Sequence, residues 1–309
     1  MSQRQLTVLG TASQVPTAQR NHVGFFLRWD REGILFDPGE GTQRQMTLAG
    51  IRAREISIIC LTHFHGDHCL GLPGVIQRLS LDRIEHPVAV VYPASGHHFL
   101  HRLLQAAIFH NRITVLEYPI SEAGVILARP GFDLISQPLD HKVETWGYRL
   151  QEPDARTLLP EHIPADVHGP ALGRLKSQGW VDSLQGRISL ENVSRLKPGQ
   201  SFALVMDTRI CPNAELLAHK ADLVLSEATY LETEAQQADN YKHLTASQAG
   251  RMAAQAGAQN LVLAHYSQRY ASLKPFAEQA GKFHPRVIVA VDGQCIDLPE
   301  RKRSLQIRG

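Results

Sequence analysis

The sequence lacks any apolar run close to the roughly 20 residues that span a bilayer, so we expect no membrane insertion. Its first residues, MSQRQLTVLG, lack the apolar core of a signal peptide. Only four cysteines occur, far apart and without a C-x-x-C spacing, which argues against a disulfide framework. Together these absences predict a reduced protein of the cytoplasm.

An excess of either charge is also missing. The chain has 32 Lys and Arg against 30 Asp and Glu, a formal net charge of +2, so any nucleic-acid partner must bind through a local patch. Hydrophobic residues make up 43% and charged residues 20%, which is typical of a globular protein with one large domain or two small ones. Histidine is abundant, with 16 residues, so the positions of these histidines indicate where a functional site is to be sought.

Apolar runs that alternate with helical patterns predict an α/β fold. In the first half, strands are expected over residues 6–9, 23–29, 34–36, 56–61 and 88–92. The run ISIICL is apolar almost throughout, as in a strand that is buried on both faces. Helices are expected over 71–81 and 96–111, the second with an inner face of Leu100, Leu103, Leu104, Ala107 and Ile108.

The second half repeats this alternation. Strands are expected in SFALVMDT, ADLVLSEAT, NLVLAHYS and RVIVAVDGQCIDL, the last taken as one strand. A short helix is expected near residues 213–218, and an Ala-rich helix in HLTASQAGRMAAQAGA. The two halves therefore share one architecture.

Residues 151–200 interrupt the pattern with five prolines and with basic and acidic side chains in balance. We interpret this segment as an insertion outside the core. On composition alone it is typical of a plain surface loop rather than a binding device.

Three histidines and an aspartate directly follow the buried run, in LTHFHGDH. On an extended backbone His63 and His65 point the same way and can hold one metal ion together. Gly66 allows a bend, after which Asp67 and His68 can reach a second position nearby. Imidazole and carboxylate without thiolate suit zinc in a hydrolytic site, with manganese possible.

Further ligands must come from distant strand ends. His141 ends the stretch LISQPLDH, Asp207 ends SFALVMD, and His265 ends NLVLAH. Each residue alone has an ordinary alternative role as a cap or a surface residue, but together they fit one cleft. Asp207 is the best bridging candidate, because two carboxylate oxygens can hold two ions about 3.5–4 Å apart.

This pattern resembles the metallo-β-lactamase superfamily, which implies a four-layer αβ/βα sandwich with a binuclear metal cleft. Within the superfamily, the chain is similar to the ribonuclease Z family, which processes the 3′ end of tRNA. The similarity covers nearly the whole chain, in the segments LTHFHGDHCLGLPG, VLGTASQVPTAQRN, FDPGEGTQRQM, LSEATY, HLTASQA and AHYSQRY.

The resemblance implies two ligand sets that share one bridging carboxylate. The first set is His63, His65, His141 and Asp207; the second is Asp67, His68, Asp207 and His265. The family also pairs Glu227 with His243 as a proton-delivery pair and uses Asp67 as proton acceptor for the attacking water. From its position alone, His243 also suits a place beside the start of the Ala-rich helix.

Substrate contacts are implied for two loops and for the insertion. The loops contribute Arg20 and Asn21 before the second strand, and Arg269 and Tyr270 after His265. In the insertion, the resemblance implies an arm that clamps tRNA, with Gly169, Pro170, Arg174 and Lys176 in its Gly-Pro element. Composition alone would make all of these ordinary polar loops.

We therefore expect a single metallo-β-lactamase domain over residues 1–309, with an inserted protruding arm at 151–200 that serves as the tRNA-binding exosite. The resemblance implies a homodimeric endoribonuclease with two zinc ions per subunit, which cuts the 3′ trailer from precursor tRNA and leaves a 3′-hydroxyl. The alternative is a lactonase, thioesterase or cyclic-nucleotide phosphodiesterase of the same superfamily. A nucleic-acid-binding protein with a structural metal site is disfavoured, because structural zinc sites are usually rich in cysteine. The basic tail RKRSLQIR is expected to be solvated.

Overall fold

The computed structural model describes residues 4–300, so the basic tail lies outside the described residues. Within that range the chain divides into two compact units, one formed by residues 4–150 and 201–299, the other by residues 151–200 together with Glu300. No helix in the described part is long and apolar enough to cross a membrane.

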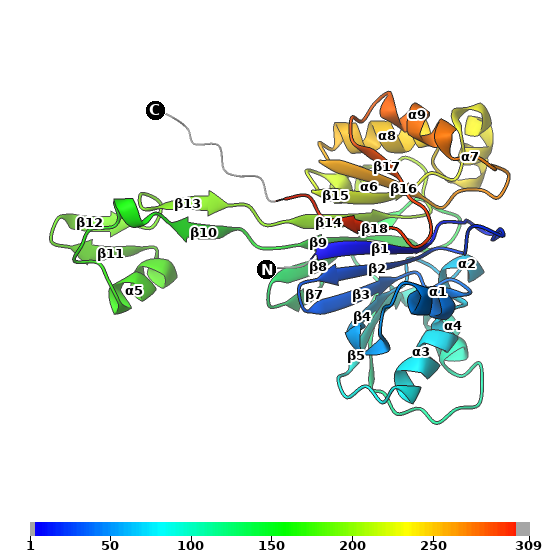
Figure 1. The fold of residues 1–309 in the computed structure, drawn as a ribbon, viewed down its shortest axis with the longest axis horizontal. Coiled ribbons are helices and arrows are strands. Elements are labelled where there is room, and N and C mark those ends of the chain that lie inside the picture. Colours follow the sequence, from blue (N-terminus) through cyan, green and yellow to red (C-terminus); the bar gives the residue numbers. More distant parts are fainter. Residues whose placement is uncertain (1–3, 301–309) are drawn as a thin grey trace. The chain divides into compact units, whose positions relative to one another are not determined.

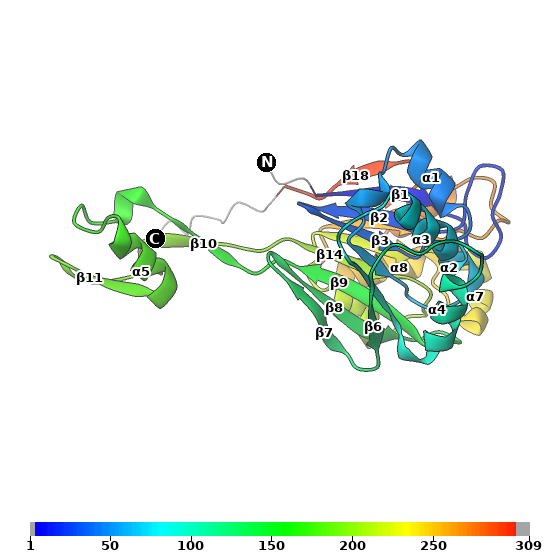
Figure 2. The same ribbon diagram turned by 90° about the horizontal axis from the view of Figure 1, so that it is seen from below.

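The first unit contains two sheets that pack face to face (Figures 1 and 2). Over residues 4–300, the first sheet has the order β18-β1-β2-β3-β4-β5-β6. Its strands are β1 (Arg4–Gly10), β2 (Gly24–Trp29), β3 (Glu32–Phe36), β4 (Ile58–Cys60), β5 (Val88–Pro93), β6 (Val115–Ile120) and β18 (Cys295–Asp297). The second has the order β17-β16-β15-β14-β9-β8-β7. Its strands are β7 (Gly124–Arg129), β8 (Phe132–Leu139), β9 (Thr145–Gln151), β14 (Ser201–Val205), β15 (Leu223–Glu227), β16 (Asn260–Ala264) and β17 (Val287–Val289).

Helices cover the outer face of each sheet (Figure 1). On the side of the first sheet lie α1 (Thr42–Leu48), α2 (Gly66–Cys69), α3 (Leu72–Leu81) and α4 (His97–Leu104). On the side of the second lie α6 (Pro212–Ala218), α7 (Ala235–Tyr241), α8 (Ala246–Gln255) and α9 (Lys274–Gly281). Short 3-10 helices occur at Ala53–Glu55, Ala94–Gly96, Pro160–His162 and Glu232–Glu234.

Three apolar layers hold this unit together. Between the sheets, the ring of Phe36 packs at 5.7 Å from Phe202 and 6.1 Å from Tyr148, centroid to centroid. Two further clusters fill the spaces between each sheet and its helices. The hydrophobic runs of the central strands are buried on both faces for this reason. The structure confirms the predicted four-layer αβ/βα sandwich.

Parallel pairing brings several strand ends to one edge. Strands β3 to β6 are parallel in the first sheet, and β14 to β17 are parallel in the second. The carboxyl ends of neighbouring parallel strands meet at the same edge, which is where open α/β sheets bind ligands. The residues that follow β4, β14 and β16, among them His63, Asp207 and His265, are therefore gathered at these edges.

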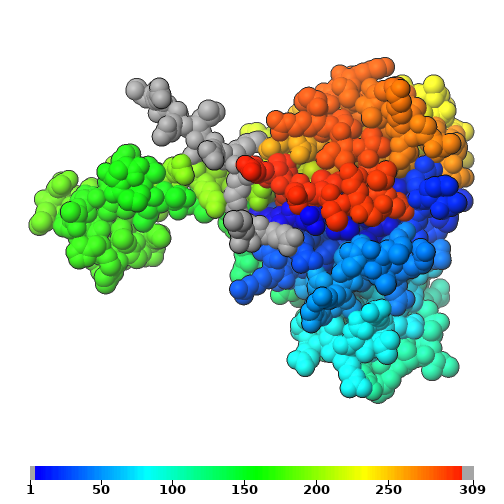
Figure 3. All heavy atoms as spheres, viewed as in Figure 1, coloured from blue at the N-terminus to red at the C-terminus, as the bar shows by residue number. Residues whose placement is uncertain are grey.

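Two of the expected elements were wrong in extent. The helix expected over 96–111 is α4, which ends at Leu104, and Ala107 and Ile108 are exposed rather than on an inner face. The run RVIVAVDGQCIDL is two strands in different sheets: β17 pairs with β16, and β18 pairs with β1. A turn at Gly293, with φ of 82°, separates them. The β18 pairing also places the end of the described chain beside its start, where red atoms border blue ones in Figure 3.

The second unit is a folded element, so the plain surface loop that composition alone favoured is wrong; the resemblance had implied an inserted arm at these residues. Strands β10 (Ala155–Leu158) and β13 (Ser194–Lys197) pair antiparallel, as do β11 (Trp180–Ser183) and β12 (Gly186–Ser189). Helix α5 (Pro170–Gln178) packs with them. A small core forms from Val167, Leu175, Val181 and Val193. These apolar residues are too widely spaced for a sequence pattern to reveal them.

Candidate metal centre

The loop after β4 carries four of the predicted ligands and is fixed by a buried aspartate that sequence analysis missed. The backbone N–H and the hydroxyl of Thr62 both donate to the Asp37 carboxylate, each at 2.7 Å. Asp37 directly follows β3, the parallel neighbour of β4, so the same strand-end reasoning could have found it. Gly39 permits the close approach of the two loops, because a Cβ there would lie 2.1 Å from the carbonyl oxygen of Asp67.

The other three predicted ligands follow the ends of strands in the second sheet. His141 lies two residues after β8, Asp207 two residues after β14, and His265 directly after β16. Asp207 and His265 have φ values of 42° and 62°, a left-handed backbone that is costly for residues with a Cβ. Such strain persists only where the surrounding structure imposes it, and it marks these two positions as functional candidates.

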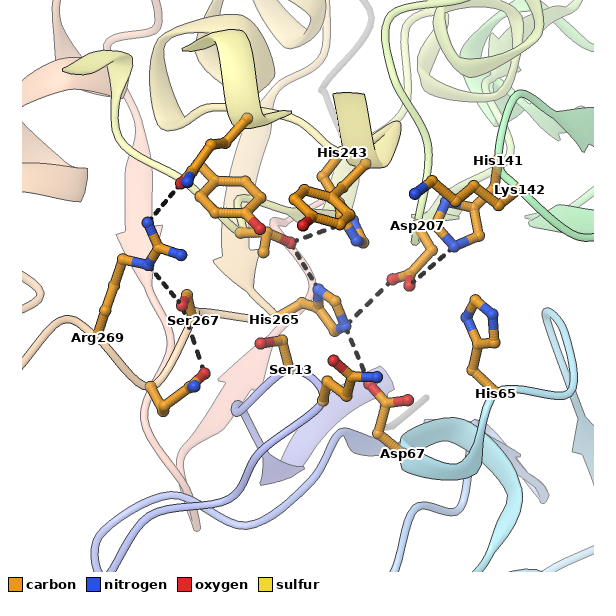
Figure 4. A pocket seen from close by; sticks show the side chains of 16 residues that line it. Ser13, His65, Asp67, His141, Lys142, Asp207, His243, His265, Ser267 and Arg269 are labelled. Atoms are coloured by element: carbon orange, nitrogen blue, oxygen red, sulfur yellow. Dashed lines mark hydrogen bonds and ion pairs between the residues drawn. The ribbon is translucent and has the colours of Figure 1, made fainter. Parts of the chain in front are cut away.

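The carboxylate of Asp207 lies between two groups of histidines, and Figure 4 shows it between His141 and His265. Its Oδ2 is 3.5 Å from Nε2 of His63 and 3.7 Å from Nε2 of His141. Its Oδ1 is 3.5 Å from Nε2 of His68 and 3.3 Å from Nε2 of His265. Each carboxylate oxygen thus faces a different pair of imidazoles, which is the arrangement of a bridging ligand.

Two further side chains complete the groups. Asp67 Oδ2 lies 3.4 Å from Nε2 of both His68 and His265. His65 Nδ1 lies 2.8 Å from Nε2 of His63. The structure thereby brings together all seven residues predicted as ligands. In one group, His63, His65, His141 and Asp207 have their ligand atoms within 4.8 Å of one another; Asp67, His68 and His265 form the other.

Four of the histidines share one orientation: Nε2 faces the centre, and Nδ1 contacts an outer oxygen. These contacts are His63 to Thr62 Oγ1 at 3.0 Å, His68 to Asp37 Oδ2 at 2.9 Å, His141 to the carbonyl of Lys242 at 3.1 Å, and His265 to Thr229 Oγ1 at 2.7 Å. Metal-binding histidines characteristically use the second ring nitrogen in this way, which fixes the ring and its tautomer. Thr62, Lys242 and Thr229 were not identified from the sequence.

The residues present fit a pair of divalent cations. Nε2 of His68, Nε2 of His141 and Oδ1 of Asp207 are buried and have no hydrogen-bond partner among residues 4–300. Buried polar atoms without partners are costly, and here all three face the same centre. Imidazole nitrogens with carboxylate oxygens form a donor set that suits zinc, with manganese also acceptable.

Burial and charge together set the ionisation of the cluster. Burial lowers the pKa of His63 well below its usual value and also lowers that of His141, so both stay neutral ligands. Burial opposes the charged form of Asp207, but the neighbouring His265 and His68 outweigh it and hold its pKa well below the usual range. Asp207 is therefore a carboxylate.

A second buried pair lies beside the cluster. Glu227, the last residue of β15, is fully buried, and its Oε1 lies 3.0 Å from Nδ1 of His243. The Thr208 N–H and the Thr229 hydroxyl also donate to this carboxylate, at 2.7 and 2.6 Å. Burial opposes the charged form of His243, but Glu227 and Asp207 outweigh it and raise the pKa of His243 to about 9. His243 also lines the cleft, so it can present a proton there.

The cluster opens into a polar cleft of about 450 Å³. Of the predicted substrate residues, Arg269 lines this cleft, and its guanidinium donates to Gln237 Oε1 at 2.6 Å (Figure 4). Lys142 and Tyr241, not identified from the sequence, also line it, with the Lys142 ammonium 4.4 Å above the tyrosine ring.

The other predicted substrate residues do not line the cleft. Arg20 donates to the carbonyls of Tyr270 and Ser267, which holds the loop that carries Arg269. The Asn21 amide donates to the carbonyl of Glu40, and the Tyr270 hydroxyl donates to Glu234. The remaining four, Gly169, Pro170, Arg174 and Lys176, are exposed on α5 or at its start, in the second unit.

The sandwich and its strand-end histidines define a metallo-β-lactamase-fold protein. The family model of the metallo-beta-lactamase superfamily matches residues 20–181. Among solved structures, the chain is similar to human tRNase Z, short form, with a TM-score of 0.70, 23% identity, and coverage of 96% of this chain and 99% of that one. A long-form RNase Z from yeast gives a TM-score of 0.67 at 16% identity, covering 96% of this chain and 42% of that one.

Relatives with higher sequence identity identify the family within this superfamily. Ribonuclease Z of Nocardia farcinica is 51% identical over 98% of this chain and all of its own length. Ribonuclease Z of Streptomyces avermitilis is 49% identical, over 97% and 100%, and that of Chlamydia muridarum is 43% identical, over 97% and 99%. The chain belongs to the ribonuclease Z family of the metallo-β-lactamase superfamily.

Proposed function

We propose that this chain is an endoribonuclease that removes the 3′ trailer from precursor tRNA and leaves a 3′-hydroxyl. The observation that carries the proposal is the Asp207 carboxylate, whose two oxygens each face a pair of imidazole Nε2 atoms. That arrangement suits phosphodiester hydrolysis at two cations, and family membership supplies the substrate class.

We propose zinc as the native ion, two per subunit, with manganese as the other candidate. His63, His65, His141 and Asp207 would hold one ion; Asp67, His68, Asp207 and His265 would hold the other. Bound there, the ions would supply Lewis acidity that lowers the pKa of a water and neutralises charge on the phosphoryl oxygens.

The chain's own groups would move the protons. Burial opposes ionisation of Asp67, but His68 and His265 outweigh it and lower its pKa, so Asp67 is a carboxylate able to accept a proton from the attacking water. Glu227 contacts Nδ1 of His243 and favours the imidazolium. His243 could then protonate the leaving 3′-oxygen from its other nitrogen, the usual role of a general acid.

Substrate binding would use both units. Arg269 and Lys142 at the cleft offer cations for the phosphates beside the cleaved bond. In the second unit, which we propose as the tRNA-binding exosite, exposed Arg174 and Lys176 suit contacts to the phosphates of an RNA duplex. Family resemblance further supports a homodimer, and the four free cysteines fit the reducing cytoplasm.

The test is cleavage of one precursor tRNA by metal-stripped protein reloaded with zinc or manganese, with the new 3′ ends mapped. A cut at the 3′ side of the acceptor stem that leaves a 3′-hydroxyl supports the proposal. Turnover of a small chromogenic phosphodiester with no cut in the precursor, under either ion, would instead favour a small-molecule hydrolase.

A further inference from the structure

A second histidine-containing cluster lies outside the cleft, where helix α4 meets strand β6. His97 and His101 are one helical turn apart on α4, so both rings project from the same side, with centroids 4.4 Å apart. Glu117 of β6 faces both rings. Its Oε2 lies 3.4 Å from Nδ1 of His97, and its Oε1 lies 3.1 Å from Nε2 of His101. The three residues can offer ligand atoms that all lie within 4.8 Å of one another.

A buried tyrosine holds this cluster in place. The side chain of Tyr92, from β5, is fully buried, and its hydroxyl donates to Glu117 Oε2 at 2.6 Å. The same hydroxyl lies 2.8 Å from Nδ1 of His97, whose ring stacks on the tyrosine ring at an interplanar angle of 22°. The Tyr92 hydroxyl therefore orients the Glu117 carboxylate and the His97 imidazole before any ion binds. Supporting contacts of this kind are characteristic of metal sites.

The chemistry of the three side chains fits a cation. Two imidazoles and one carboxylate are the His₂Glu donor set that holds zinc in several enzymes, and here their ligand atoms lie within 4.8 Å of one another. The side chains of His97 and His101 are 60% and 44% exposed, which leaves an entry path and room for water to complete the coordination.

We propose that His97, His101 and Glu117 form a further divalent-cation site, selective for zinc over magnesium and calcium because of its two nitrogen donors. None of the three lines the cleft as described over residues 4–300, so the site is distinct from the candidate metal centre. This inference does not depend on the proposed function.

The position of the site suggests what it does. An ion there would tie α4 to β6 directly above Tyr92. Phe64, which lies in sequence between two cleft ligands, packs against Tyr92 at 6.3 Å and against Phe99 of α4 at 5.9 Å, centroid to centroid. The start of α4 also contacts Phe64 closely, since a Cβ on Gly96 would lie 2.0 Å from its ring. Binding at α4 would therefore stabilise the aromatic packing beside the loop that carries His63 and His65.

The test compares zinc binding to the wild-type chain and to variants, by calorimetric titration after the cleft has been loaded and excess metal dialysed away, with ion counts by mass spectrometry. The wild type is expected to bind one more zinc ion than the double variant His97→Ala/His101→Ala. Glu117→Gln should weaken that step at least tenfold, and magnesium should give no such step. His98→Ala, an exposed neighbour on the same helix, serves as the matched control and should bind as the wild type does.

The readout is the difference in stoichiometry between folded proteins, verified by circular dichroism, so it does not depend on how many ions the cleft holds or on activity. Equal stoichiometry in the wild type and the double variant would overturn the inference. A loss of the same size in His98→Ala would also overturn it, since the step would then not belong to this cluster.

Discussion

Asp207 and His265 lie 3.3 Å apart, Oδ1 to Nε2, although they follow two strands that are not neighbours. Strand β15 lies between β14 and β16, and it ends with Glu227. Asp207 and His265 both leave their strands in the left-handed conformation, which costs on the order of 1–3 kcal/mol at each position. The register of three parallel strands thus sets the distance between two ligands and places the Glu227 carboxylate beside them.

Replacing the bridging carboxylate tests this arrangement. In Asp207→Asn, the negative charge is lost and an amide NH2 group replaces the oxygen that faces one of the two histidine pairs, so we expect both metal content and precursor cleavage to fall, the latter by at least about 100-fold. Metal content is measured by mass spectrometry after dialysis. Asp239→Asn, at an exposed carboxylate on α7, is the matched control. Full metal content in Asp207→Asn would show that the carboxylate does not bridge.

The aspartate that contacts His68 from outside gives a separate prediction. In Asp37→Asn, the ring of His68 loses its charged acceptor 2.9 Å away, so we expect zinc affinity to fall about 10- to 100-fold. Competition with a chromogenic chelator measures the affinity. Because the defect is in binding, excess zinc should restore most of kcat. An unchanged affinity in the folded variant would contradict the assigned role of Asp37.

The residues that gather in the cluster were largely predictable from the sequence, because the motif is local and strand ends are easy to recognise. Asp207 and His265 each follow an apolar run, and parallel pairing of β14, β15 and β16 gathers their ends at one edge of a sheet. The outer contacts were not predictable. Asp37 acts on His68 only because β3 pairs with β4, and the carbonyl of Lys242 reaches His141 across 101 positions of the sequence.

The prediction of secondary structure failed where long-range strand pairing overrode the local sequence pattern. The apolar run through Val291 and Cys295 looks continuous, but its two parts find partners in different sheets. The helical pattern after Gly96 continues in the sequence beyond the point where α4 ends, at Leu104. Composition alone did not reveal the second unit as a folded element, because its small core is assembled from scattered valines and leucines, among them Val167 and Val193.

Proton delivery can be separated from metal binding. In His243→Ala, we expect kcat for precursor cleavage to fall about 10²- to 10⁴-fold with metal content unchanged, because the general acid is lost and all seven predicted ligands remain. A chromogenic phosphodiester with a nitrophenol leaving group needs no such proton and should be affected far less. His219→Ala, at an exposed histidine, is the control. An equal loss on both substrates would argue against proton donation by His243.

Reversing the charge of the second unit separates RNA binding from chemistry. In Arg174→Glu/Lys176→Glu, two exposed cations of α5 become anions, so we expect kcat/KM for precursor tRNA to fall at least about tenfold. The salt dependence of tRNA binding should also become shallower, because fewer counterions are released when fewer phosphates are contacted.

Turnover of the small phosphodiester should stay unchanged, since both side chains lie in a unit that contributes no residue to the cleft. Lys220→Glu/Lys282→Glu, at two exposed positions of the first unit, makes the same change in net charge and is the control. Equal losses in this control and in the α5 variant would assign the effect to overall charge and contradict an exosite in residues 151–200.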